Sequence, residues 1–281
     1  MKDARYHAFQ ILKKYYRSNN RLKAVRDQYY KNNKLHQQDI SRSLVLTNEV
    51  VRWQGRLDFW INLFLDKPIH KLHPSVHIIL RIGFFEALMD EFVPQHAAVH
   101  SWVEFAKKEL GKKFSGLVNA LLRKTNNIDP NQKDKKQSLS AWYSYPAWII
   151  DKWIHQFGEE KTIELCEYLN MPSHIDLRLN CMTESKDTIL SRLDKLDVEI
   201  IQSPESDCFI RVDSGLRNVV KSELFTKGLI YVQDRASGAV VELLDPQPGD
   251  IVLDVCAAPG TKSGYIVEKI KNEGKIFASD I

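Results

Sequence analysis

A turn of small residues, following an apolar segment, has the composition of a nucleotide-like cofactor site. The turn runs Cys256-Ala257-Ala258-Pro259-Gly260-Thr261-Lys262, after an expected strand at 251–255. Small side chains let the backbone approach a ligand closely, and the N–H groups that open the next helix favour negative charge. Asp280 lies 18 residues beyond Lys262, at the tip of a second expected strand. A carboxylate there can accept hydrogen bonds from both hydroxyls of a ribose, so the pattern fits an adenosyl cofactor.

Two better-known nucleotide sites do not match this turn. It lacks the GxGxxG spacing of dinucleotide sites and the first glycine of a P-loop, although Thr261-Lys262-Ser263 is similar to the end of one. A plain strand, turn and helix without a ligand is the alternative interpretation.

The elements around the turn predict the opening of a doubly wound sheet. A helix is expected over 236–244, a turn over 246–250, a helix over 263–270 and a strand over 275–280. In such sheets, ligands bind beyond the carboxyl ends of the strands. Two strands cannot bury both of their faces, so we expect the 281 residues to be part of a longer protein.

Residues 3–125 are expected to be helical throughout, which predicts an all-α domain. Asp39 is a candidate N-cap for a long amphipathic stretch that ends at Lys67-Pro68, with a possible break at Gly55. After His73-Pro74, residues 76–89 are apolar nearly all round, as in the buried centre of a bundle. Val93-Pro94 precedes the next helix, which runs to residue 110.

The middle of the chain predicts a small α+β module. Ser144-Tyr145-Pro146 precedes a helix over 147–157, and a second helix is expected over 159–169. Residues 175–179 alternate as in a half-buried strand, and 209–212 and 229–232 are further short strands. The expected divisions are an all-α domain (1–126), a polar linker (127–140), the α+β domain (141–232) and an α/β Rossmann-like segment (233–281).

The charge is divided unevenly along the chain. Residues 1–140 hold 25 lysines and arginines against 13 aspartates and glutamates, and residues 141–281 hold 15 against 23. A basic half suggests contact with a polyanion, although a solvated basic face is the alternative. The candidate phosphate contacts are Lys107, Lys108, Lys112, Lys113, Arg123 and Lys124. Arg178, on the expected strand, could touch RNA or face water.

Other site classes receive little support. The four cysteines form no CxxC pair, and Cys166, Cys181 and Cys208 are expected to be packing residues. His73 and His77 lie four residues apart without a third ligand, so no metal is expected. No apolar run reaches membrane-spanning length and no signal peptide is evident. We expect a cytoplasmic monomer.

Several of these strings resemble one known family. The segment from Leu253 to Lys262 resembles the first motif of the RNA cytosine-5 methyltransferases of the RsmB/Sun–Nop2 group, with Thr261 in place of a second glycine. Residues 231–237 and 177–180, with Pro146-Ala147-Trp148, are similar to its landmarks. Segments 82–86, 93–99 and 116–123 resemble the NusB-type domain that precedes the bacterial enzymes.

The resemblance implies S-adenosyl-L-methionine as cofactor and methylation of C5 of a cytosine in small-subunit ribosomal RNA. A thiolate adding at C6 makes C5 nucleophilic, and the family's nucleophilic cysteine lies in PCS- and TCS-type strings. Neither string occurs here, so we expect that motif beyond Ile281 and the chain alone to be inactive. Cys256 matches a cofactor-binding residue and not the nucleophile. The rival interpretation is a non-catalytic, NusB-like RNA-binding protein of antitermination or RNA processing.

Overall fold

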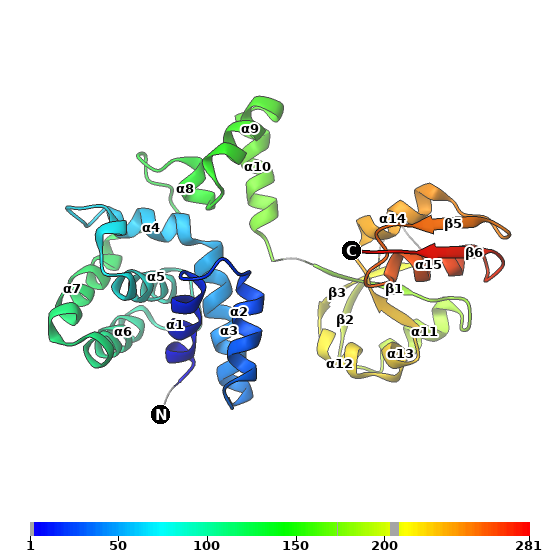
Figure 1. The fold of residues 1–281 in the computed structure, drawn as a ribbon, viewed down its shortest axis with the longest axis horizontal. Coiled ribbons are helices and arrows are strands. Elements are labelled where there is room, and N and C mark those ends of the chain that lie inside the picture. Colours follow the sequence, from blue (N-terminus) through cyan, green and yellow to red (C-terminus); the bar gives the residue numbers. More distant parts are fainter. Residues whose placement is uncertain (1–2, 173, 203–207) are drawn as a thin grey trace. The chain divides into compact units, whose positions relative to one another are not determined.

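The computed structural model describes residues 3–172, 174–202 and 208–281. The chain forms two compact units, residues 1–171 and residues 172–281, which are labelled by element in Figure 1. We describe each unit by itself.

The first unit is entirely helical in its described part. Its elements are α1 (Ala4–Tyr15), α2 (Leu22–Lys31), α3 (Gln37–Arg52), α4 (Gln54–Asn62), η1 (Ile69–Lys71), α5 (Pro74–Leu88), α6 (Gln95–Leu110), α7 (Lys112–Leu122), η2 (Arg123–Asn127), α8 (Leu139–Tyr143), α9 (Ala147–Phe157) and α10 (Glu159–Asn170).

Helix α5 is the buried centre of this unit, as predicted. Its side chains are buried along nearly the whole length, and α1, α4, α6 and α7 pack around it. The helix begins where expected, because Pro74 occupies its first turn and the His73 side chain accepts a hydrogen bond from the Ser75 N–H. Gly83 permits the close approach of α7, since a Cβ there would lie 2.8 Å from Leu122 Cδ2.

The buried carboxylate of Glu86 links three elements around α5. It accepts hydrogen bonds from Arg5 Nε at 2.8 Å, Arg42 Nη2 at 2.6 Å and Trp102 Nε1 at 2.8 Å, and its side chain has no exposed surface. Arg42 also pairs with Asp90. Burial would lower the pKa of Arg42, but hydrogen bonds to Asp90 and Glu86 raise it above its usual value. The network therefore ties α1, α3 and α6 to the central helix.

Two boundaries differ from the sequence prediction. Asp39 lies inside the first turn of α3, and the N-cap is His36, whose side chain makes no capping hydrogen bond. The predicted cap at Asp39 is wrong, because the helix starts at Gln37, three residues before the start that a cap at Asp39 would give. The long stretch breaks at Trp53 and not at Gly55, and α4 ends at Asn62, well before Pro68.

Helices α8, α9 and α10 belong to the first unit. The buried Arg56 of α4 reaches α8, because its Nε donates to the Trp142 carbonyl at 2.5 Å and its backbone N–H donates to Ser144 Oγ at 3.0 Å. Its guanidinium lies 3.7 Å from the centre of the Trp142 ring. Burial lowers the pKa of Arg56 to about 10. Residues 139–170, which the sequence analysis assigned mostly to the α+β domain, thus pack with the preceding helices, and the functional domain boundaries stay a prediction.

The second unit contains two small sheets in its described part. The elements are β1 (Ile175–Leu179), α11 (Lys186–Leu193), β2 (Glu199–Gln202), β3 (Phe209–Ser214), α12 (Leu216–Lys221), α13 (Glu223–Thr226), β4 (Ile230–Val232), α14 (Arg235–Leu244), β5 (Ile251–Asp254), α15 (Thr261–Lys269) and β6 (Lys275–Ala278). Strands β2, β3, β1 and β4 pair antiparallel in that order, and β5 pairs with β6 in parallel.

Both faces of the four-stranded sheet are covered. Leu177, Leu179 and Ile210 pack with α11, α12 and α13 on one face. On the other, Phe209 packs with Tyr265 of α15. Gly238 brings α14 against the same ring, since a Cβ there would lie 2.2 Å from Phe209 Cζ. The sheet is therefore an interior layer that supports α14 and α15.

Apolar side chains of the β5–β6 pair are exposed, as expected for a sheet of two strands that cannot bury both of its faces. Ile251 is 70%, Leu253 67% and Phe277 59% exposed. Residues 256–262, the turn that the sequence predicts to bind a cofactor (called the cofactor turn below), follow β5 at the end of this pair.

A candidate cofactor site at the end of two parallel strands

The cofactor turn and Asp280 meet at one edge of the β5–β6 pair. The register aligns Ile251 with Lys275 and Asp254 with Ala278, so both strands end at the same level. Beyond that level, the Ala257 N–H donates to the Ser279 carbonyl at 3.1 Å, and the Ala258 N–H donates to Asp280 Oδ2 at 2.8 Å. The acid and the turn that the sequence singled out separately are thus in contact.

The turn ends in backbone geometry that favours glycine. Gly260 is the N-cap of α15 with φ of +105°, a value that side chains disfavour. The Ala258–Pro259 peptide is cis. The N–H groups of the first turn of α15 have no partner within the helix, and they provide donors for a polar or anionic ligand group.

Lys262 is held against the turn. Its Nζ donates to the Cys256 carbonyl at 2.8 Å. The charge therefore stays at the turn, where it adds to the positive end of α15, while the ammonium also braces the backbone. The Cys256 and Asp280 residues are exposed. The edge is therefore open to a ligand.

The sequence analysis missed two residues that hold the turn in place, Asp254 and Ser263. Asp254 is buried, accepts from the Cys256 N–H through Oδ1 at 3.1 Å, and accepts from Ser263 Oγ through Oδ2 at 2.7 Å. The carboxylate therefore joins the end of β5, the turn and the start of α15. An acid at the carboxyl end of a strand, with a serine nine residues later in the next helix, is the signal that could have found them.

Removing this link is expected to weaken cofactor binding. We predict that Asp254→Ala lowers the affinity for the expected adenosyl cofactor at least tenfold, because two hydrogen bonds that shape the turn are lost, each contributing about 1–3 kcal/mol. Ser263→Ala, which removes one of them, should lower it by a smaller factor. Asp250→Ala, at the other end of β5, is the control. Equal calorimetric affinities for Asp254→Ala and Asp250→Ala would contradict this role.

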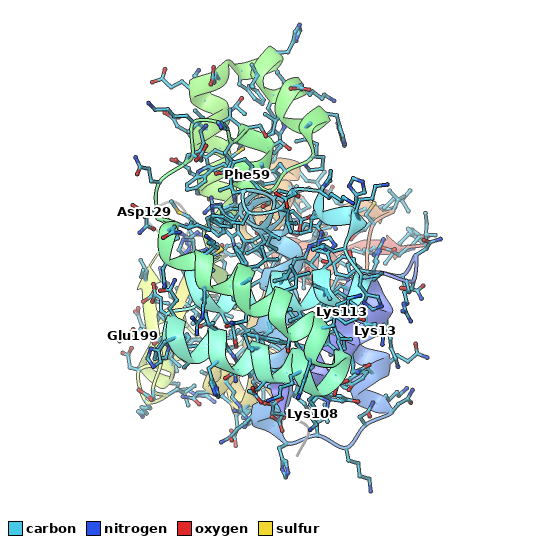
Figure 2. All side chains as sticks on the ribbon, turned by 90° about the vertical axis from the view of Figure 1, so that its left-hand side faces the viewer. Lys13, Phe59, Lys108, Lys113, Asp129 and Glu199 are labelled. Atoms are coloured by element: carbon cyan, nitrogen blue, oxygen red, sulfur yellow. The ribbon has the colours of Figure 1, made fainter. Side chains whose placement is uncertain are left out.

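The predicted RNA contacts divide between surface and interior. Lys107, Lys108, Lys112, Lys113, Arg123 and Lys124 are all exposed on α6, α7 and η2. Figure 2 labels Lys108 and Lys113 near the turn that joins α6 to α7.

Arg178 has no exposed surface, so its predicted contact with RNA is wrong for this structure. Its Nε donates to Gln233 Oε1 at 2.7 Å, its Nη1 pairs with Glu268 of α15, and its guanidinium lies 4.7 Å from the ring centre of Tyr265. The side chain faces α15 because that helix covers this face of β1. It holds the helix that follows the cofactor turn.

The remaining candidate groups lie apart from the turn. Cys166 is buried, and burial followed by the charge of Glu167 raises the pKa of its thiol. Cys181 is exposed, so its predicted packing role is wrong. Among the described residues, no cluster of histidine, cysteine, aspartate or glutamate could hold a metal ion. In that same part of the chain, no helix is long and apolar enough to cross a membrane.

Comparison with known families accounts for most of the chain in three segments. Residues 2–127 match the NusB family, residues 145–219 match the Methyltr_RsmF/B-like ferredoxin-like domain, and residues 241–281 match the 16S rRNA methyltransferase RsmB/F family. The chain joins a NusB domain to RsmB/F-type methyltransferase domains. The expected fold class is thereby confirmed: an all-α NusB-like bundle, a small α+β domain, and the start of a Rossmann-like α/β methyltransferase domain.

Similar proteins are longer than this chain. A probable ribosomal RNA small subunit methyltransferase B of Synechocystis is 30% identical over 100% of this chain and 64% of its own length. A Bacillus subtilis protein of the same description is 28% identical over 94% of this chain and 58% of its own. The chain thus spans about three fifths of these relatives. A solved structure, PH0851, is similar in fold, with a TM-score of 0.65 at 23% identity over 97% of this chain and 61% of its own.

Proposed function

We propose that this chain is the RNA-binding and cofactor-binding part of an enzyme that methylates C5 of a cytosine in small-subunit ribosomal RNA, using S-adenosyl-L-methionine. The observation that carries the proposal is the contact between Asp280 and the turn at Ala258, at the carboxyl ends of two parallel strands. The family match of residues 241–281 and the relatives named as ribosomal RNA methyltransferases support it. They do not favour the alternative of a non-catalytic antitermination protein.

The residues at this edge fit an adenosyl cofactor. The exposed carboxylate of Asp280 is an acceptor for ribose hydroxyls, and the small residues Ala257, Ala258 and Gly260 leave the turn backbone accessible. Cys256, Pro259, Thr261 and Lys262 complete the proposed binding turn. When bound, S-adenosyl-L-methionine supplies an electrophilic methyl group on sulfur. The protein's part is to hold the ribose and orient that methyl toward the base.

The acceptor carbon determines what else the reaction needs. C5 of cytosine is a poor nucleophile, and addition of a thiolate at C6 converts it into an enamine-like carbon. Of the four cysteines, Cys256 lies in the binding turn with its carbonyl engaged by Lys262, and Cys166 is buried in the helical unit. Cys181 and Cys208 line a separate cavity with Tyr265, Glu268 and Lys269, in the last turns of α15. We therefore propose that these 281 residues bind cofactor and RNA without completing the transfer. Further proposals are a cytoplasmic location, a monomeric state and phosphate contacts by the exposed lysines of α6 and α7.

Titration calorimetry with the 281-residue chain tests the cofactor proposal. We expect S-adenosyl-L-methionine to bind, and Asp280→Ala to weaken binding by roughly 10–100-fold, because hydrogen bonds to a charged acceptor contribute about 1.5–3 kcal/mol. Asp250→Ala should bind like the unchanged protein. Undiminished binding by Asp280→Ala would show that Asp280 is not part of the cofactor site. Absence of binding by the folded, unchanged chain would show that the turn does not bind the cofactor either.

A further inference from the structure

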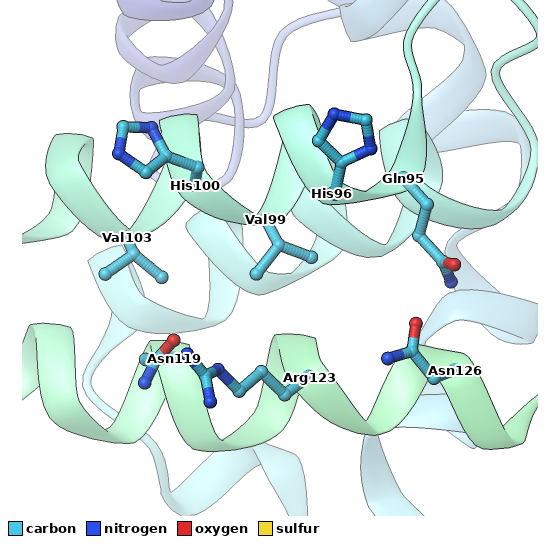
Figure 3. A pocket seen from close by; sticks show the side chains of 8 residues that line it. All are labelled: Gln95, His96, Val99, His100, Val103, Asn119, Arg123 and Asn126. Carbon is cyan, nitrogen blue, oxygen red and sulfur yellow. The ribbon is translucent and has the colours of Figure 1, made fainter.

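Each unit contains a cavity, and the two cavities differ in the side chains that line them. In the helical unit, imidazole, guanidinium and carboxamide groups line a cavity of about 410 Å³ between α6 and the segment formed by α7 and η2 (Figure 3). In the second unit, a cavity of about 400 Å³ lies beside α15 and is lined by two thiols, those of Cys181 and Cys208. Two thiols can be joined by a covalent bond, which gives the second cavity a chemistry of its own.

The backbone brings these two cysteines to the same end of β1 and β3. The register pairs Arg178 with Phe209. One residue further along, the Leu179 N–H donates to the Cys208 carbonyl at 2.8 Å, and Cys181 follows two residues later. Diagonal neighbours in a regular antiparallel pair lie about 7–8 Å apart, whereas a disulfide needs Cα atoms about 4.4–6.8 Å apart. A small displacement therefore suffices to join the two cysteines.

The two thiols differ in their freedom and in their accessibility. Because β1 ends at Leu179, Cys181 stands in the turn at 181–183, outside the hydrogen-bonded ladder, and it is exposed. Cys208 is half-buried and packs against the apolar cluster that includes Phe209 and Tyr265. A dissolved oxidant therefore reaches Cys181 first, and the turn can bring Cys181 to Cys208 without breaking the pairing of β1 with β3.

Electrostatic interactions link the two thiols to each other and to α15. The pKa of the Cys181 thiol is raised, first by desolvation and then by the charges of Cys208 and Glu268. Lys186 opposes the shift. Burial raises the pKa of the Tyr265 phenol, and Cys208 is among the further causes. Cys208 thus lies within electrostatic reach of both Cys181 and Tyr265. A raised pKa keeps the Cys181 thiol largely protonated near neutral pH, so it reacts slowly with oxidants.

We propose that Cys181 and Cys208 form a site of reversible oxidation, at which hydrogen peroxide converts the two thiols into a disulfide bond. The Cys181 thiolate attacks one oxygen of the peroxide, the O–O bond breaks, and a sulfenic acid forms as hydroxide leaves. The Cys208 thiolate then attacks the sulfenic sulfur, so that the S–S bond forms and the S–O bond breaks with loss of a second hydroxide. The two hydroxides take up the two thiol protons as water. Both sulfur atoms are oxidised, and the peroxide is reduced.

The disulfide fastens the end of β1 to the start of β3 and closes a loop that contains α11 and β2. A link of this kind restricts the unfolded chain, so the oxidised form resists heat better than the reduced form. The proposal depends on neither RNA binding nor cofactor binding, and its test has separate readouts.

Mass spectrometry of the 281-residue chain, treated with hydrogen peroxide and then with N-ethylmaleimide, tests the pairing. We expect two fewer maleimide additions than in the untreated chain, and digestion with trypsin should give a linked pair of peptides, 179–186 and 196–211. Dithiothreitol should reverse both results. Cys181→Ser and Cys208→Ser should each abolish the linked pair. Cys256→Ser removes an exposed thiol of the same unit and should leave the linked pair unchanged.

Heat unfolding followed by circular dichroism tests whether the bond fits the folded unit. The oxidised chain should unfold roughly 5 °C above the reduced chain, and Cys208→Ser should show no such difference. A disulfide between other cysteines would overturn the proposal, as would addition of oxygen at Met182 of the same cavity while both thiols stay free. An oxidised chain that unfolds at the same or a lower temperature would overturn it too, because the bond would then form only by distorting the fold.

Discussion

Replacing Glu86 by alanine should destabilise the helical unit by about 3–5 kcal/mol, the usual cost of removing one partner from a buried ionic network. The substitution leaves the half-buried Arg5 and Arg42 without this carboxylate and the buried Trp102 indole without its acceptor. The effect is large because Glu86 stands in the central helix and joins three others to it. Denaturant unfolding followed by far-ultraviolet circular dichroism measures it.

Replacing an exposed glutamate distinguishes the effect of losing the buried network from the effect of losing one negative charge. Glu104 of α6 is 54% exposed in its side chain and pairs with Lys107 at 3.4 Å, so Glu104→Ala should cost less than about 1 kcal/mol. Glu86→Gln keeps the shape and one acceptor oxygen, and its cost should lie between the two. A cost for Glu86→Ala no greater than that for Glu104→Ala would show that the buried contacts contribute nothing net.

The sequence predicted helix starts well wherever a local signal decides them. Proline at or before the first turn places α5 at Pro74, α6 at Gln95 and α9 at Ala147. Proline fixes its own φ and lacks an N–H, so its preference for helix starts needs no distant contact. Asp39 shows the limit of such signals. An acid fits the first turn of a helix as well as its cap, and α3 starts at Gln37, so that Asp39 lies within its first turn.

The burial of a side chain could not be predicted where it depends on partners far away in the sequence. Alternation in β1 predicted one buried face, yet four of its five residues are buried, because α15 covers the second face from ninety residues away. Asp254 was missed for a different reason: its partner Ser263 lies only nine residues along the chain, and the spacing of the two was a signal that the sequence analysis did not use. The turn and Asp280 were recognisable because the order of strand, turn, helix and strand brings them together in any parallel pair.

Arg178→Met should destabilise the unit of residues 172–281 by about 3–5 kcal/mol and weaken cofactor binding with it. The substitution leaves Glu268 without its charged partner and takes a guanidinium from between the rings of Tyr231 and Tyr265. Because Glu268 lies on α15, whose first turn follows the cofactor turn, loosening that contact loosens the site. Denaturant unfolding and calorimetry measure the two effects. Arg217→Met, at an exposed position on α12, should change neither.

The pH dependence of the stability lost by Arg178→Met tests whether Glu268 causes the loss. Burial raises the pKa of the Glu268 carboxyl, while Arg178 opposes the shift by hydrogen bonding and by charge. Without Arg178 the folded-state pKa should rise further above the unfolded value. A raised folded-state pKa stabilises the fold at low pH, and that stability is lost as pH rises through it. Arg178→Met should therefore cost less at pH 5 than at pH 8.

Replacing both partners completes the test. The double variant Arg178→Met with Glu268→Leu removes the uncompensated carboxylate, and apolar substitutes for a buried ion pair are often neutral or stabilising. It should recover at least half of the stability lost by Arg178→Met and should lose the pH dependence. A double variant as unstable as the sum of the single changes would mean that Arg178 acts through the aromatic rings and Gln233, independently of Glu268. Recovery of cofactor affinity together with stability would show that the cofactor turn depends on how firmly α15 is held against β1.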